Sequence, residues 1–216
     1  MNNTRLVLTT FFSLIVLLSS SQYNFDYGIK LGGANYLGDI GGQEQTRRDF
    51  IMDMKLSQTS WVAGGYARYK FSPSIAANFS VNYGTIKGDD ALSTNIARNA
   101  RNLRFKNNIL EISARAEYYL FKANDIGGKG RYWVSLKTFS HVGVSAFNHS
   151  PKGSFDGSSW TSLQPLQTEE VYYSKWQIGV PVGGGLFFTF KNKHRIGWDF
   201  TWTITFTDYL DDISTE

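Results

Sequence analysis

The chain has 216 residues, a formal net charge of +4, 16% aromatic residues and no cysteine. The lack of cysteine excludes disulfides, thiolate metal ligands and cysteine nucleophiles. The mild positive charge, without a run of Lys or Arg, does not indicate a nucleic-acid partner. The length suits one domain, such as a single β-barrel.

Residues 1–21 have the pattern of a secretory signal peptide. Arg5 supplies the positive charge, an apolar run follows it, and small residues such as Ser19 and Ser21 precede Gln22. A membrane anchor is the alternative, but the run is short for a spanning helix and has no basic flank. We therefore expect the mature chain to begin at Gln22.

Residues 23–31 alternate apolar and polar side chains, which is the period of a strand with one apolar face. Six later segments show the same alternation, less regularly in the fourth of them. These segments are residues 61–71, 75–84, 109–121, 131–147, 174–190 and 195–206. Most are about ten residues or longer, whereas strands of soluble sandwiches are usually about 5–6 residues long.

Charged residues occur in the middle of these strands, opposite the apolar face. They are Asp26, Lys30, Arg68, Lys70, Glu111, Arg115, Glu117 and Asp199. Long strands with a polar inner face and an apolar outer face are typical of outer-membrane barrels. We expect the inward charges to pair across a packed lumen, which argues against a solute channel.

The connections between the predicted strands alternate in length. Residues 72–74, 122–130 and 191–195 form shorter connections, whereas residues 86–104 and 148–170 form long ones. This alternation predicts periplasmic turns and extracellular loops, with the first strand running outward. Because bacterial barrels have even strand numbers, we expect an all-β, antiparallel transmembrane β-barrel of eight strands. Seven would lie in residues 22–216, with the last strand missing and residues 207–216 beginning the fourth extracellular loop.

Four stretches resemble the PorG-like outer-membrane barrels of Bacteroidetes, which are components of the type IX secretion system. The stretches are residues 31–39, 101–105, 163–169 and 206–212. The sequence departs from the family pattern at residues 146–153. The resemblance implies a location in the cell outer membrane and a role in anchoring a periplasmic ring. That ring would consist of a PorK-like lipoprotein and a PorN-like partner.

Histidines raise an alternative function, a lipid-A-modifying barrel enzyme. Such an enzyme needs a histidine with a serine or aspartate near the outer rim. His141 and Ser145 lie in the outer half of the fifth predicted strand, and His149 lies in the following predicted loop. Packing in the lumen and solvation in a loop are the simpler explanation of these residues, and the one we favour. No nucleophile motif accompanies them, so we expect no enzyme activity.

Carboxylates in the predicted outer loops could bind calcium, although they are also ordinary loop residues. They are Asp39, Asp89, Asp90, Asp208, Asp211 and Asp212. We expect no metal site and no cofactor.

The predicted periplasmic turns are basic, and they are the candidate surface for binding partners. Their cations are Lys122, Lys129, Arg131, Lys191, Lys193 and Arg195, against the single acid Asp125. Such edges could meet an acidic ring surface or lipid head groups, or they could simply be solvated. A structural barrel paralogue without a role in secretion remains a further alternative.

Overall fold

The computed structural model describes residues 24–36, 56–90, 103–126, 128, 134–154, 159–166, 174–191, 193–207 and 210. The predicted signal peptide lies outside these residues. Across the described part of the chain, no helix has both the length and the apolar character needed to span a membrane.

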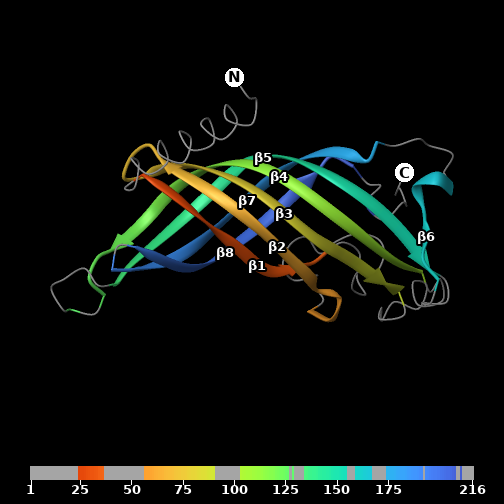
Figure 1. Cartoon of the computed structure of the whole chain (residues 1–216), viewed down its shortest axis with the longest axis horizontal. Helices are drawn as coiled ribbons and strands as arrows, with labels where there is room; N and C mark the ends of the chain where they lie inside the picture. The colour runs from red at the N-terminus through yellow and green to blue at the C-terminus, as the bar shows by residue number, and fades with distance from the viewer. Residues whose placement is uncertain are drawn as a thin grey trace, which may run out of the picture.

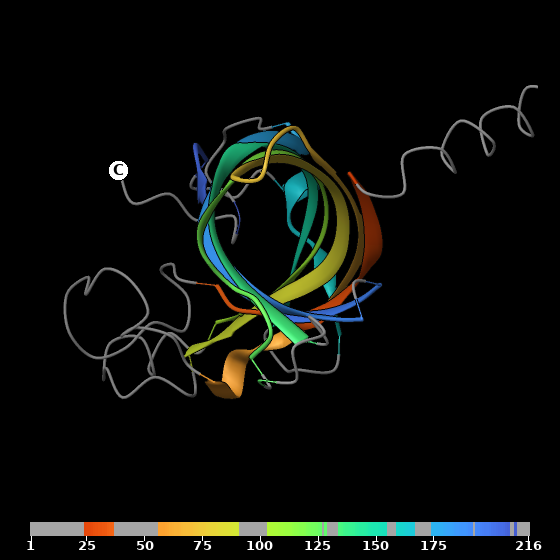
Figure 2. The same ribbon diagram turned by 90° about the vertical axis from the view of Figure 1, so that its left-hand side faces the viewer.

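One antiparallel sheet contains all the described strands and curls into a barrel-like wall (Figure 1, and end-on in Figure 2). Seven long strands form it in the order β1-β2-β3-β4-β5-β7-β8, and the two-residue strand β6 pairs with β5. The strands are β1 (Phe25–Ala34), β2 (Ser60–Lys70), β3 (Ile75–Asp89), β4 (Arg104–Ala123), β5 (Val134–Ser154), β6 (Thr161–Ser162), β7 (Trp176–Phe190) and β8 (His194–Thr205). Two short 3-10 helices, η2 (Leu56–Gln58) and η4 (Gln164–Leu166), lie in the connections. The predicted all-β antiparallel architecture is confirmed, while β6 was not predicted.

The period-two alternation places apolar side chains on the outer face of every long strand. Successive side chains of a strand point to opposite faces. In each long strand, the mainly apolar alternate residues therefore face outward, and the residues between them face the lumen. The exposed outer residues include Ile29 of β1, Phe79 of β3, Val144 of β5 and Trp198 of β8. The prediction of an apolar outer face is confirmed.

The two ends of the barrel differ in their connections. Tight connections at residues 71–74 and 191–193 lie at one end, on the left in Figure 1, which we call the turn end. Ser72 shapes the first of them, because its hydroxyl accepts hydrogen bonds from the backbone N–H groups of Ser74 and Ile75, at 3.3 and 3.0 Å. We call the opposite end, where β1, β3, β5 and β8 finish, the loop end.

The strands reach further toward the loop end than the sequence pattern predicted. The β3–β4 ladder continues to the pair Asp89 and Arg104, within the predicted loop of residues 86–104. Likewise β5 continues to Ser154, so His149 lies in a strand and not in a loop. The prediction was wrong because it followed the apolar alternation, which stops where the outer face becomes polar although the backbone ladder continues.

A β-bulge interrupts the β4–β5 ladder near the turn end. Tyr119 pairs with Phe139, but Thr138 pairs with Phe121, so Leu120 is the extra residue. Leu120 and Phe121 are both exposed on the outer face. The bulge therefore adds a large apolar side chain to the outer wall near its rim, a common place for bulges.

The edge strands β1 and β8 share no backbone ladder in the described residues. Six antiparallel pairings separate them along the sheet, so the two strands run in the same direction. Side chains bridge them instead, through Lys30 with Asp199 at 2.8 Å and through Arg195 with Asp26. The predicted eighth strand stays a prediction.

Candidate functional site

Arg68 and Glu117 form a buried ion pair on the inner face near the turn end. Two nitrogens of the Arg68 guanidinium contact the Glu117 carboxylate, Nη2 at 3.0 Å from Oε1 and Nε at 2.6 Å from Oε2. Asn78 donates a further hydrogen bond of 2.6 Å to Oε1. Residues of three neighbouring strands thus meet at one carboxylate, and a hydrogen bond between charged groups is stronger than one between neutral groups.

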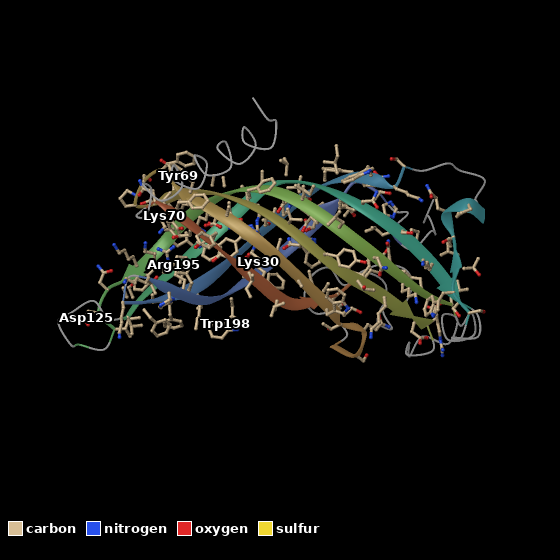
Figure 3. All side chains as sticks on the ribbon, in the orientation of Figure 1. Lys30, Tyr69, Lys70, Asp125, Arg195 and Trp198 are labelled. Atoms are coloured by element: carbon tan, nitrogen blue, oxygen red, sulfur yellow. The ribbon has the colours of Figure 1, made fainter. Side chains whose placement is uncertain are left out.

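A second polar centre surrounds Asp199 of β8, nearer the middle of the lumen. Its carboxylate contacts Lys30 Nζ at 2.8 Å, Arg115 Nη1 at 3.2 Å and His141 Nε2 at 3.0 Å. Figure 3 shows Lys30 in the middle of the barrel. These partners come from β1, β4 and β5, so one carboxylate links strands from all around the wall.

Arg115 extends this centre across the inner face. It donates to Thr201 Oγ1 at 3.1 Å and to Ser80 Oγ at 3.2 Å, and Ser80 hydrogen bonds to Ser113 at 2.8 Å. Glu111, one of the predicted inward charges, accepts a hydrogen bond from Asn82 at 3.1 Å. The prediction that the inward charges pair is therefore confirmed for seven of the eight residues, whereas Glu111 bonds to an amide and not to a cation.

Apolar layers lie on the inner face on both sides of these polar centres, and the sequence pattern did not predict them. Toward the turn end, Ala76, Tyr119, Phe139 and Phe187 form a buried cluster, and the Arg68 guanidinium lies over the Phe139 and Phe187 rings. Toward the loop end, Ile86 and Phe105 form a second cluster with several half-buried residues. Polar centres and apolar clusters thus alternate along the described inner face.

The histidines do not form a catalytic arrangement at the outer rim. His141 is near the middle of β5, with its side chain fully buried against Asp199 and within 3.3 Å of Thr201. The Ser145 hydroxyl donates to the backbone oxygen of Gly179. His149 is buried beside Phe147. These contacts match the packing role, and the expectation of no enzyme activity stays a prediction.

Two of the candidate calcium ligands lie in the described residues. Asp89 pairs with Arg104 at 3.1 Å, and Asp90 is buried next to it. The other four, Asp39, Asp208, Asp211 and Asp212, lie outside the described residues. The described part of the chain holds no group of three or more His, Cys, Asp or Glu residues able to hold a metal ion.

The candidate partner-binding cations fall into three groups. Lys122, Lys191 and Lys193 lie at the turn end, in β4 and in the connection before β8. Arg195 lies inside β8 and pairs with Asp26, so its charge is not available at the rim as the sequence reading expected. Lys129 and Arg131 lie outside the described residues.

Two further lysines lie on the inner face at the turn end: Lys70, which the sequence pattern placed inward, and Lys137, which the prediction missed. Lys70 pairs with Asp26 at 3.2 Å, and Lys137 lies over the Tyr119 ring at 5.2 Å. Lys122 stands directly opposite Lys137 in the β4–β5 register. The period-two pattern could also have found Lys137, because this residue shares the inward parity of its strand.

Positive charge therefore dominates the described residues of the turn end. Among them, Asp26, Glu117 and Asp125 are the carboxylates, and Figure 3 shows Lys70, Asp125 and Arg195 at this end. The seven cations are Arg68, Lys70, Lys122, Lys137, Lys191, Lys193 and Arg195, of which Arg68, Lys70 and Arg195 pair with Glu117 or Asp26. Such an excess of charge favours contact with an acidic surface.

The chain belongs to the family described as a domain of unknown function, DUF6089, whose model matches residues 4–216. No curated protein and no solved structure matches the chain.

Proposed function

We propose that this protein is an outer-membrane β-barrel that anchors a periplasmic assembly of the type IX secretion system. The outer wall supports the membrane location. Its seven long strands present exposed apolar side chains such as Ile29, Phe79 and Trp198. A continuous apolar wall is stable against lipid chains and costly in water.

Anchoring explains the lumen better than transport does. The Arg68–Glu117 pair, the Asp199 centre and two apolar layers occupy the described inner face. A transport function needs a water-filled passage lined by polar groups. Side chains that pair with each other across the inner face leave the two ends and the outer wall for contact with other proteins.

The single observation that carries the partner proposal is the positive charge of the turn end. Its described residues include seven cations and three carboxylates, and three of the cations pair with Glu117 or Asp26. Directly opposed like charges, as at Lys122 and Lys137, are destabilising without a compensating anion. An acidic protein surface would supply that compensation. With the turn end in the periplasm, the proposed partners are the PorK-like lipoprotein and the PorN-like ring protein.

The test is capture of partners from native membranes with the tagged full chain. We expect the PorK-like and PorN-like proteins to co-purify with the wild type. A variant with Lys122, Lys191 and Lys193 changed to Gln should retain them at least tenfold less well. The matched control changes the same three residues to Arg, which keeps the charge, and it should retain them.

Capture of neither protein, together with normal secretion in a deletion strain, would overturn the anchoring role. The protein would then be a structural barrel of the outer membrane. Equal capture by the Gln and Arg variants would place the contact elsewhere on the barrel and would contradict the role of the turn end.

A further inference from the structure

Three lysines form one row across the outer face near the loop end. The ladder pairs Lys87 of β3 with Lys106 of β4, and it pairs Lys106 with Lys152 of β5. Directly paired residues point to the same face of a sheet, and the inward neighbours Ile86, Phe105 and Pro151 are buried. All three lysines therefore project from the outer wall, away from the lumen.

The row lies just beyond the apolar part of the wall. On β3 and β4 the last large exposed apolar residues are Tyr83 and Leu110, which pair with each other. Lys87 is four residues beyond Tyr83, a distance of about 13 Å along the strand, and less along the membrane normal because barrel strands tilt. In the proposed membrane orientation, this is the depth of the lipid head groups.

Among the described residues, no acid on the neighbouring outer face is shown paired with the lysines of the row. Asp89, the next outward acid on β3, pairs with Arg104 at 3.1 Å. Like charges directly opposite each other destabilise a sheet, so three lysines in adjacent strands are unfavourable without a bound anion. The row thus has the concentrated positive charge that is expected of an anion-binding site.

Trp160 adds a contact that holds one of the lysines in place. The Lys106 ammonium lies over the indole ring at 4.0 Å from its centroid. Trp160 is itself partly exposed, and Trp side chains favour the membrane interface, where one side is apolar and the other wet. The indole therefore fits the same depth as the lysines.

We propose that Lys87, Lys106 and Lys152 bind the phosphate groups of an anionic lipid head group. This inference rests on the proposed membrane location. A lipid is the occupant because the lysines stand on the wall that faces lipid. Opposed residues are about 5 Å apart, so the row extends over about 10 Å and suits a head group with two phosphates better than one with a single phosphate.

The test measures lipid-dependent stability of the full-length barrel in zwitterionic detergent by its heat-modifiable gel mobility. The probes are bis-phosphorylated lipid A, phosphatidylglycerol, phosphatidylcholine and free pyrophosphate. We expect lipid A to stabilise the wild type most and phosphatidylcholine to have no effect. Changing the three lysines to Gln should weaken apparent lipid A binding about a hundredfold.

Two controls separate a specific site from general charge. Changing the three lysines to Arg keeps the charge and should retain binding. Lys175, an exposed lysine outside the row, gives a single-charge comparison, because Lys175→Gln should bind as wild type while Lys106→Gln binds about fivefold more weakly.

The outcomes of these experiments test the lipid site and the anchoring role separately. Equal stabilisation by pyrophosphate and lipid A would overturn the lipid assignment. Unchanged lipid A binding in the Gln variant, in a barrel that still shows heat-modifiable mobility, would overturn the site. Loss of partner capture with retained lipid binding would overturn the anchoring role alone.

Discussion

Lys30 of β1 and Asp199 of β8 form an ion pair of 2.8 Å between two strands that share no backbone ladder. Asp199 also contacts Arg115 and His141. One carboxylate therefore links the edges of the sheet to its middle, and it replaces part of the cohesion that backbone hydrogen bonds supply between the other strands.

Asp199→Asn should destabilise the barrel more than a change at any one of its partners. The substitution leaves Lys30 and Arg115 without their carboxylate. Because the Asp199 side chain is 22% exposed, the cost should stay below the roughly 3–5 kcal/mol of a fully buried pair. Lys30→Met should cost less, because Asp199 keeps two of its partners. Urea unfolding in detergent, followed by tryptophan fluorescence, would measure both. A larger effect for Lys30→Met would contradict the central role of Asp199.

Arg68 and Glu117 should show strong energetic coupling. Either Arg68→Met or Glu117→Leu leaves the other charge buried without its partner, at a cost of about 3–5 kcal/mol. The double variant removes both charges and leaves apolar side chains beside Phe139 and Phe187, so it should be more stable than the sum of the single effects predicts. A double-mutant cycle measures this coupling, and additive effects would show that the pair is not coupled.

Trp198 should require an apolar replacement because it faces outward. It is 68% exposed on β8, and Arg on the lipid face near the bilayer midplane costs about 2–4 kcal/mol. Trp198→Arg should reduce the fraction that shows heat-modifiable mobility after membrane assembly. Trp198→Leu keeps the apolar surface and should assemble nearly as well. Equal assembly of the two variants would mean that this face does not meet lipid.

Lys191 should be replaceable by Gly with a gain in stability. Its backbone has φ of 50°, and the N–H of Lys193 donates to the carbonyl of Phe190 at 3.0 Å, which closes a tight turn. A non-glycine residue with left-handed backbone costs roughly 1–2 kcal/mol. Lys191→Gly should therefore stabilise the barrel by about 1 kcal/mol, whereas Lys193→Gly should not. The midpoint of urea unfolding checks the comparison.

The sequence predicted the wall more completely than the lumen. Outward positions such as Phe79 and Trp198 follow a simple period of two, because lipid or water contact sets their polarity strand by strand. Glu117 and Arg68 were correctly placed inward by the same parity. Their pairing with each other depends on strand tilt and register across the whole sheet, which no local pattern contains.

Inward aromatic residues show where the pattern failed. Phe139 and Phe187 occupy inward positions, yet both are as apolar as the outward set. A binary pattern cannot distinguish a residue in a lumen cluster from one on the outer wall. Similarly, the sequence alone does not predict the lysine row, because Lys87, Lys106 and Lys152 become neighbours only through the register of three strands.

The orientation of the barrel can be tested with single cysteines, because the 216-residue sequence contains none. Ser74 is exposed in the turn before β3, and Ser162 is exposed in β6 near the loop end. In the proposed orientation, a membrane-impermeant maleimide should label Ser162→Cys on intact cells and should not label Ser74→Cys. Both should react after the outer membrane is permeabilised, which controls for reactivity. Labelling of Ser74→Cys alone on intact cells would reverse the topology. It would also place the basic turn end outside the cell, where it could not reach a periplasmic ring.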